Sequence, residues 1–176
     1  MAAKTSTFYL TERLTIDATA TDFTDTIDLG AYVDVADRQG ILVHEVDYIV
    51  QGTTPGEGLA VTTGTSNMEA FFQLTDLNRG ALVFGDDRAL VSSGNFFYDT
   101  DGGIADTRDL YPDNFGPSSA QGGRIVINDQ MYLRGRCTTL ASGKALNVTC
   151  RIKCSVISLS QKDFMAIALQ STAADN

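Results

Sequence analysis

The chain has 176 residues, enough for one domain with a buried core. Apolar residues make up 43% and charged residues 20%, which excludes a largely disordered chain. The formal charge of −9 argues against a protein that wraps nucleic acid, and a single His argues against a zinc site built on several imidazoles. We expect one domain over residues 1–176, with an N-terminal arm over 1–7 and a mobile tail over 171–176.

Apolar residues recur at every second position along most of the chain, which predicts strands rather than helices. The segment 41–51 is apolar at both parities and rich in β-branched residues, which indicates a central strand. In the predicted strand 88–100, Gly94 interrupts the run of apolar residues and predicts a bend or a bulge. In chain order, the predicted strands are 8–18, 23–35, 41–51, 68–75, 81–84, 88–100, 124–134 and 147–158.

Two further segments complete the predicted organisation. Residues 100–123 contain two prolines and several glycines, and we expect one extended loop there. Residues 161–170 predict a short helix, because Ser160 can cap it, Asp163 takes the capping-box position, and Phe164 and Ile167 follow at helical spacing. Many strands without alternating helices predict an all-β antiparallel sandwich, and about eight strands in this length favour a jelly roll with a short C-terminal helix.

Few side chains in the sequence could support catalysis or bind a metal. Asp99, Asp101 and Asp106 surround a pair of glycines, so calcium binding and a solvated acidic turn both stay open. We interpret His44 as a packed or hydrogen-bonded structural residue, since its neighbours Glu45 and Asp47 point away from it on a strand. We therefore expect no catalytic, metal or cofactor-binding residue, and no enzyme.

The cysteines and the bases have equally plain interpretations. Three cysteines, an odd number, argue against a disulfide framework and indicate buried thiols; they are Cys137, Cys150 and Cys154. Five bases gather near the last two predicted strands, where they form either a solvated sheet face or a contact for an acidic surface; they are Arg134, Arg136, Lys144, Arg151 and Lys153. Residues 1–7 hold no apolar stretch, and no segment has the length of a membrane span, so we expect synthesis in the cytoplasm and no transmembrane segment.

Three features together carry a resemblance to a known family. They are the strands 124–134 and 147–159 near the C-terminus, the short helical segment SQKDFMAIAL over 160–169, and a start that runs directly into strands. Collectively they resemble the small single jelly-roll capsid proteins of tailless icosahedral viruses, especially those of archaea and bacteria. The resemblance implies a structural protein of the virion, made in the host cytoplasm, whose partners are copies of itself and other capsid proteins.

One departure from that family limits what the shell would enclose. Capsid proteins that package RNA often carry a basic N-terminal arm, whereas Lys4 is the only base before Arg13 here. We therefore expect no direct binding of nucleic acid, and an inner shell face that meets a membrane or other proteins. The negative charge would keep subunits soluble and would oppose their assembly, so we expect salt or divalent cations to strengthen assembly.

Two other functions stay open at this point. The chain could be a filament subunit that donates the strand 8–18 to a neighbour. A carbohydrate-binding jelly roll could use exposed aromatic residues, for which the candidates are Tyr9, Tyr32, Phe97 and Tyr111. A cupin-like enzyme would need a cluster of His ligands, which one His cannot supply.

Overall fold

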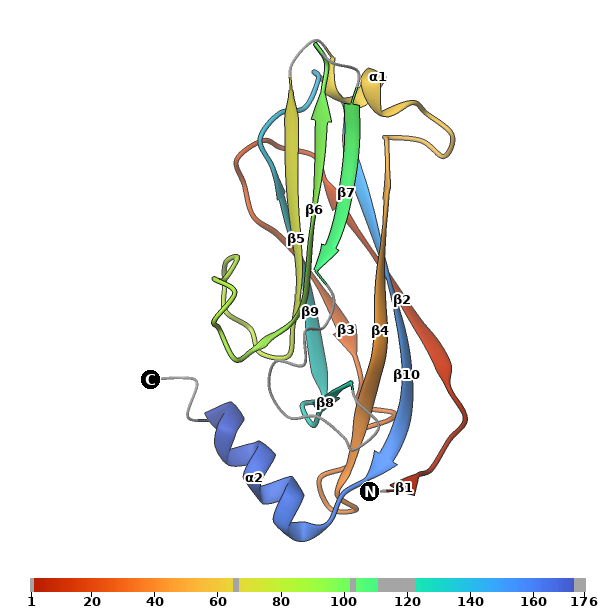
Figure 1. Ribbon diagram of the computed structural model, residues 1–176, viewed down its shortest axis with the longest axis vertical. Coiled ribbons are helices and arrows are strands. Elements are labelled where there is room, and N and C mark those ends of the chain that lie inside the picture. The colour runs from red at the N-terminus through yellow and green to blue at the C-terminus, as the bar shows by residue number, and fades with distance from the viewer. Residues whose placement is uncertain (1, 65–66, 102–103, 111–122, 173–176) are drawn as a thin grey trace.

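The computed structural model describes residues 2–64, 67–101, 104–110 and 123–172. These residues form two antiparallel sheets packed face to face, with the helix α1 (Leu59–Thr63) at the upper end and α2 (Gln161–Thr172) at the lower end (Figure 1). The predicted all-β sandwich with a short C-terminal helix is confirmed. The single turn of α1 was not predicted, since five residues are too few to show a helical period.

The first sheet contains the longest strands of the molecule. The strand β10 lies between β2 and β4, and β4 also pairs with β8 at the edge. The short β1 pairs with the last residues of β10, beyond the point where β2 begins. The bounds are β1 (Ala2–Ala3), β2 (Phe8–Ile16), β4 (Gln39–Gln51), β8 (Arg124–Val126) and β10 (Leu146–Ser158).

The second sheet has the order β3-β9-β5-β6-β7, and every neighbouring pair in it is antiparallel. The predicted strand 68–75 agrees with β5 at both ends. The bounds are β3 (Phe23–Asp28), β5 (Met68–Thr75), β6 (Leu90–Asp99), β7 (Ile104–Leu110) and β9 (Gln130–Cys137).

The order of the strands is that of a jelly roll. From β2 to β10, the connections β5–β6 and β6–β7 stay within the second sheet. Every other connection carries the chain from one sheet to the other. The four strands β2-β10-β4-β8 therefore face β3-β9-β5-β6, which is the winding of two Greek keys into a double sheet. The strands β1 and β7 are additions to these eight.

Alternating side chains of both sheets fill the core between them. On β10 the residues of even number from Leu146 to Cys154 are fully buried, which confirms the alternation expected there. The sheets approach closely at Gly135 on β9, where a Cβ atom would lie 2.8 Å from side-chain carbons of both Leu14 and Ile16. Glycine is therefore the residue that lets β2 pack against β9.

The strand β4 is apolar at both parities because it contains a bulge. Lys153 of β10 pairs with Glu45 while Cys154 pairs with Val43, so His44 is an extra residue in the ladder. Before the bulge, Ile41 and Val43 face the core; after it, the core-facing residues are Val46 and Tyr48. The predicted central strand is confirmed, and the bulge explains its lack of simple alternation.

A second, smaller apolar cluster lies at the lower end of the first sheet, beneath α2. The sheet contributes residues whose parity is opposite to that of the core-facing ones, so this cluster is separate from the main core. Its members are Leu42, Ile125, Ile127, Ile157 and Leu159, together with Phe164 and Ile167 of α2. The helix begins as predicted, because the Asp163 N–H donates to Ser160 Oγ at 3.2 Å and the Ser160 hydroxyl donates to the Asp163 carboxylate at 2.7 Å.

Two predicted strands are shorter or absent. The strand predicted over 23–35 ends at Asp28, because the N–H groups of Tyr32 and Val33 both donate to the carbonyl of Leu29 and close a turn. The segment 81–84 is not a strand. Its Val83 backbone bonds to the side-chain amide of Gln73 in both directions, at 2.8 Å each, so a side chain replaces the strand partner.

Three other predictions are also corrected. Part of the loop expected over 100–123 is the strand β7, which pairs with β6, while 111–122 lie outside the described residues. The single strand predicted over 124–134 is two strands, β8 and β9, in different sheets. Gly94 pairs regularly with Phe72, and the irregularity lies at Val91, because Ser92 pairs with Leu74 and Leu90 with Thr75.

Candidate assembly surfaces

The outer face of the first sheet carries ion pairs between neighbouring strands. Arg151 of β10 binds Asp47 of β4, and Lys153 binds Glu45 at 3.4 Å; each pair lies directly opposite in the register. The side chains are about half exposed, so solvent screens both pairs. Beside them, His44 Nε2 is 2.9 Å from Ser155 Oγ, which confirms a hydrogen-bonded structural histidine.

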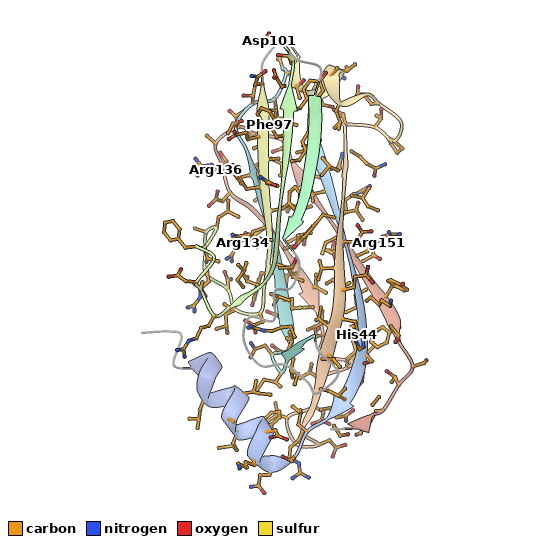
Figure 2. The ribbon with its side chains drawn as sticks, viewed as in Figure 1. His44, Phe97, Asp101, Arg134, Arg136 and Arg151 are labelled. Carbon is orange, nitrogen blue, oxygen red and sulfur yellow. The ribbon has the colours of Figure 1, made fainter. Side chains whose placement is uncertain are left out.

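The five bases do not form one patch. Figure 2 places Arg151 on one side of the sandwich and Arg134 and Arg136 on the other. Four of the five are exposed or half-buried, and each of these has an acidic partner in its own chain: Arg136 lies 3.6 Å from Asp22 and Lys144 binds Glu57, besides the pairs of Arg151 and Lys153. Of the two interpretations left open for these bases, a single contact for an acidic surface is not supported, because carboxylates distant in sequence neutralise them.

On the outer face of the second sheet, a buried arginine anchors a loop. Arg134 of β9 is fully buried, and burial lowers its pKa. Its guanidinium donates to Thr24 Oγ1 at 3.1 Å, to the Ala81 carbonyl at 3.1 Å and to the Asn78 side chain, so three of its contacts are neutral acceptors. Together with the Gln73 amide, it fastens the loop 77–87 to the sheet.

The tip of this loop exposes a large apolar side chain. Phe84 is 89% exposed, the highest value among the large apolar residues of the described chain. The loop is fixed on both sides of the tip, by Val83 on Gln73 and by Asp87, which binds Arg79 at 3.3 Å and accepts from the Ala89 N–H at 2.8 Å. Figure 1 shows the loop projecting from the left side of the sandwich, above α2.

The helix α2 is apolar on both of its sides. Phe164 and Ile167 pack into the lower cluster, while Met165 and Leu169 are 54% and 64% exposed on the opposite side. A helix with apolar residues on its outer side as well as on its packed side is typical of one that is covered on both sides. Neither Phe84 nor this exposed side was identified from the sequence, although Met165 and Leu169 are visible there as apolar residues outside the buried stripe.

Two ion pairs mark the two ends of the sandwich. At the lower end, Arg124 Nη2 lies 2.9 Å from Asp76 Oδ2, and both side chains are buried. Burial raises the pKa of Asp76, and the guanidinium of Arg124 lowers it by less. At the upper end, the hydrogen bond from Lys144 holds the pKa of Glu57 below its ordinary value.

The acidic turn near the top of β6 shows no metal-binding arrangement among the residues that are described. The Asp99 carboxylate accepts the Asp101 N–H at 2.9 Å, which closes the turn (Figure 2 labels Asp101). Asp106 lies on β7, where its backbone pairs with Phe97. Across the described chain, no group of three His, Cys, Asp or Glu residues could hold a metal ion.

The three cysteines are buried thiols, as predicted. Burial raises the pKa of Cys137 to about 11 and that of Cys154 to about 12, so both are protonated at neutral pH. In the described residues no helix has the length and apolar character needed to cross a membrane.

The structure bears on two of the alternative functions. Tyr9 is on β2 of the first sheet and Phe97 is on β6 of the second, each at the parity that faces away from the core, so they cannot form one sugar-stacking platform. Tyr32 stacks on Phe8 at 5.0 Å, and Tyr111 lies outside the described residues. The strand proposed as a filament donor is β2, which pairs along its full length with β10 of its own chain.

The comparisons with known proteins include a structural likeness to a solved structure. No protein-family model matches the chain, and no curated protein matches its sequence. A chain of the solved structure named Desmodium yellow mottle tymovirus has 8% sequence identity and a TM-score of 0.37, and the alignment covers 89% of this chain and 91% of that one. The archaeal or bacterial type expected from the sequence stays a prediction.

Proposed function

We propose that the chain is a structural subunit of a viral capsid, and that its copies assemble side by side into a closed icosahedral shell. The observation that carries the proposal is the strand order, in which β2-β10-β4-β8 faces β3-β9-β5-β6. This double-sheet jelly roll is the architecture of many viral shell proteins. It supplies a rigid wedge whose loops and end helices are free to contact neighbours.

The side chains at the surface favour a role in assembly rather than a reaction on a small molecule. The single His is engaged with Ser155, and the cysteine thiols are buried, so the described chain offers neither a His ligand cluster nor a reactive thiol. Large exposed apolar side chains lie instead on separate elements that different neighbours could cover. They are Tyr9 on β2, Val35 on the connection between β3 and β4, Val61 on α1, Phe71 on β5, Phe84 on the loop 77–87, and Met165 and Leu169 on α2.

The proposal extends to the contents of the shell and to its location. The net charge of −9 and the pairing of Arg136, Lys144, Arg151 and Lys153 with carboxylates of the same chain favour an inner face that meets a membrane or other proteins rather than the genome. The chain would be made in the host cytoplasm and would end in the virion.

Electron microscopy of the purified protein over a salt series tests the proposal. We expect closed particles of one size, and light scattering that rises with ionic strength or with divalent cations, because screening reduces the repulsion between acidic subunits. Fibres would instead support a filament subunit. Monomers at every salt concentration, or scattering that falls as salt is added, would contradict a self-assembling shell.

A further inference from the structure

The loop 77–87 and the outer side of α2 both carry large exposed apolar side chains. Four exposed residues of α2 stand at positions i, i+3, i+4 and i+7, namely Lys162, Met165, Ala166 and Leu169. Four helical residues at this spacing surround a hole of the kind that receives a side chain in knobs-into-holes packing. Because the Ala166 side chain is small, a side chain that enters this hole can approach the helix backbone there. Met165 and Leu169 are the two larger apolar residues around it.

Phe84 has the properties of the matching knob. It is 89% exposed, and the loop that carries it is held by the buried Arg134 and by Gln73. A side chain that is already fixed in place loses little conformational freedom on binding. Exposing a phenylalanine costs free energy in water, so a loop anchored by a buried cation indicates that this side chain is presented for contact.

The charges next to the two elements also match. Asp86 is exposed two residues after the knob, and Lys162 is exposed at the edge of the hole. Within one subunit both Phe84 and the hole are exposed, so a subunit does not fill its own hole. The occupant that combines an apolar knob with a neighbouring carboxylate is another copy of the same chain.

We propose that Phe84 of one copy inserts into the hole formed by Lys162, Met165, Ala166 and Leu169 of a second copy, with Asp86 next to Lys162. This inference rests on the proposed function and assigns one of its subunit contacts. The contact is heterologous, because knob and hole are different surfaces of one chain, and such contacts close into rings when the rotation between copies allows it. Rings of subunits are the units from which a closed shell is built.

Cysteine crosslinking between two differently labelled copies tests the contact directly. Because the native cysteines are buried, they give little background. A Phe84→Cys subunit mixed with an Ala166→Cys subunit should form a mixed disulfide dimer under mild oxidation. The matched control pairs Val35→Cys with Ala166→Cys, since Val35 is also an exposed apolar residue on another loop, at 66% against 89% for Phe84. Crosslinking no greater than in this control would overturn the contact.

Charge reversal provides a second, independent readout. Asp86→Lys and Lys162→Asp should each weaken self-association about tenfold in sedimentation velocity, because each places like charges together. The double variant Asp86→Lys/Lys162→Asp should restore it. Association that stays weak in the double variant would contradict the pairing, and circular dichroism of each exposed-site variant checks that it is folded.

The outcomes separate this contact from the proposed function. Particles in electron micrographs without the mixed crosslink would overturn the contact and leave the shell proposal standing. A mixed crosslink in a protein that forms no particles would support the contact and overturn the shell.

Discussion

Each end of the sandwich has an ion pair between two segments of the chain, but the two pairs differ in how far they are buried. At the lower end, Arg124 and Asp76 are removed from water and lie beside a second apolar cluster covered by α2. At the upper end, Lys144 and Glu57 form a similar pair between two connections, but both stay partly exposed next to the five residues of α1. In the lower pair, each buried charge is stabilised mainly by the other. In the upper pair, water also solvates both charges.

The contrast shows that the burial of a salt bridge and the other hydrogen bonds of its two side chains determine how much it stabilises the fold. The Arg124 guanidinium also donates to the carbonyl of Arg88, and Asn128 donates to the carbonyl of Asp76 at 2.7 Å. These bonds connect β8 of the first sheet to the segment that follows β5 of the second. The lower end is therefore the place where the two sheets are joined by polar groups, and the following variants test that difference.

The largest effect is expected for Arg124→Met. This change leaves the Asp76 carboxylate buried without its cation, and we expect a loss of about 4 kcal/mol in the free energy of unfolding at neutral pH, measured in urea. The loss should shrink in acid, when Asp76 takes up a proton. The matched change at the upper end, Lys144→Met, should cost much less. Equal losses for the two variants would contradict the difference between the ends.

A double variant separates lost charge pairing from lost packing. Arg124→Met/Asp76→Leu removes both charges from the buried site, so most of the stability should return. If the double variant is as unstable as Arg124→Met alone, the hydrogen bonds of Arg124 to its other neighbours matter more than the pair.

A smaller effect is expected for Phe164→Ala, which removes the largest side chain that α2 contributes to the lower cluster. We expect a loss of about 3 kcal/mol, together with faster amide hydrogen exchange in α2 and unchanged exchange in the middle of β10. The control is Met165→Ala on the exposed side of the same helix, for which we expect less than about 0.5 kcal/mol in the unassembled protein. A similar loss from both variants would contradict the separate lower cluster.

The smallest effect is a pair of opposite pH dependences. Asp76 has a raised pKa, so its contribution to stability is present below its ordinary value of 3.8 and is lost as the pH rises through the raised value. Glu57 has a lowered pKa, so its contribution is present above its ordinary value of 4.5 and is lost as the pH falls through the lowered one.

Urea unfolding across the acidic range checks these signs. As the pH falls from about 7 to about 3, wild-type stability should rise relative to Asp76→Asn and fall relative to Glu57→Gln. Two differences that change in the same direction with pH would contradict the assignment of opposite environments to the two carboxylates.

The parts of the fold that sequence could predict are those with a simple local pattern. The alternation of β10, the bounds of β5 and the cap of α2 were predicted because each depends on neighbours within a few positions. The strand β7 was missed because its charged residues and the glycines before it are typical of a loop. The division between β8 and β9 was missed because Ile125 and Met131 share a parity, although one faces the lower cluster and the other the main core.

The candidate surfaces depend more strongly on tertiary contacts. Arg151 and Asp47 are paired by the register of β10 on β4, which no local pattern shows. The loop 77–87 contains a short apolar run that favours a strand, and only the anchors from Gln73 and Arg134 turn it into a support for Phe84. Sequence could therefore suggest a shell protein by resemblance, but not which residues touch in the shell.

The bulge in β4 has a consequence for how this chain tolerates change. Because His44 is out of step with β10, one continuous strand serves the main core on one stretch and leaves Leu42 for the helix on the other. Deleting that single residue would restore a regular ladder in which Val43 still lies opposite Cys154 and Ile41 still lies opposite Val156, so both side chains would keep facing the core. We therefore expect the loss of one residue to be tolerated at His44, with only its contact to Ser155 removed, because the residues on both sides of the bulge keep their partners on β10.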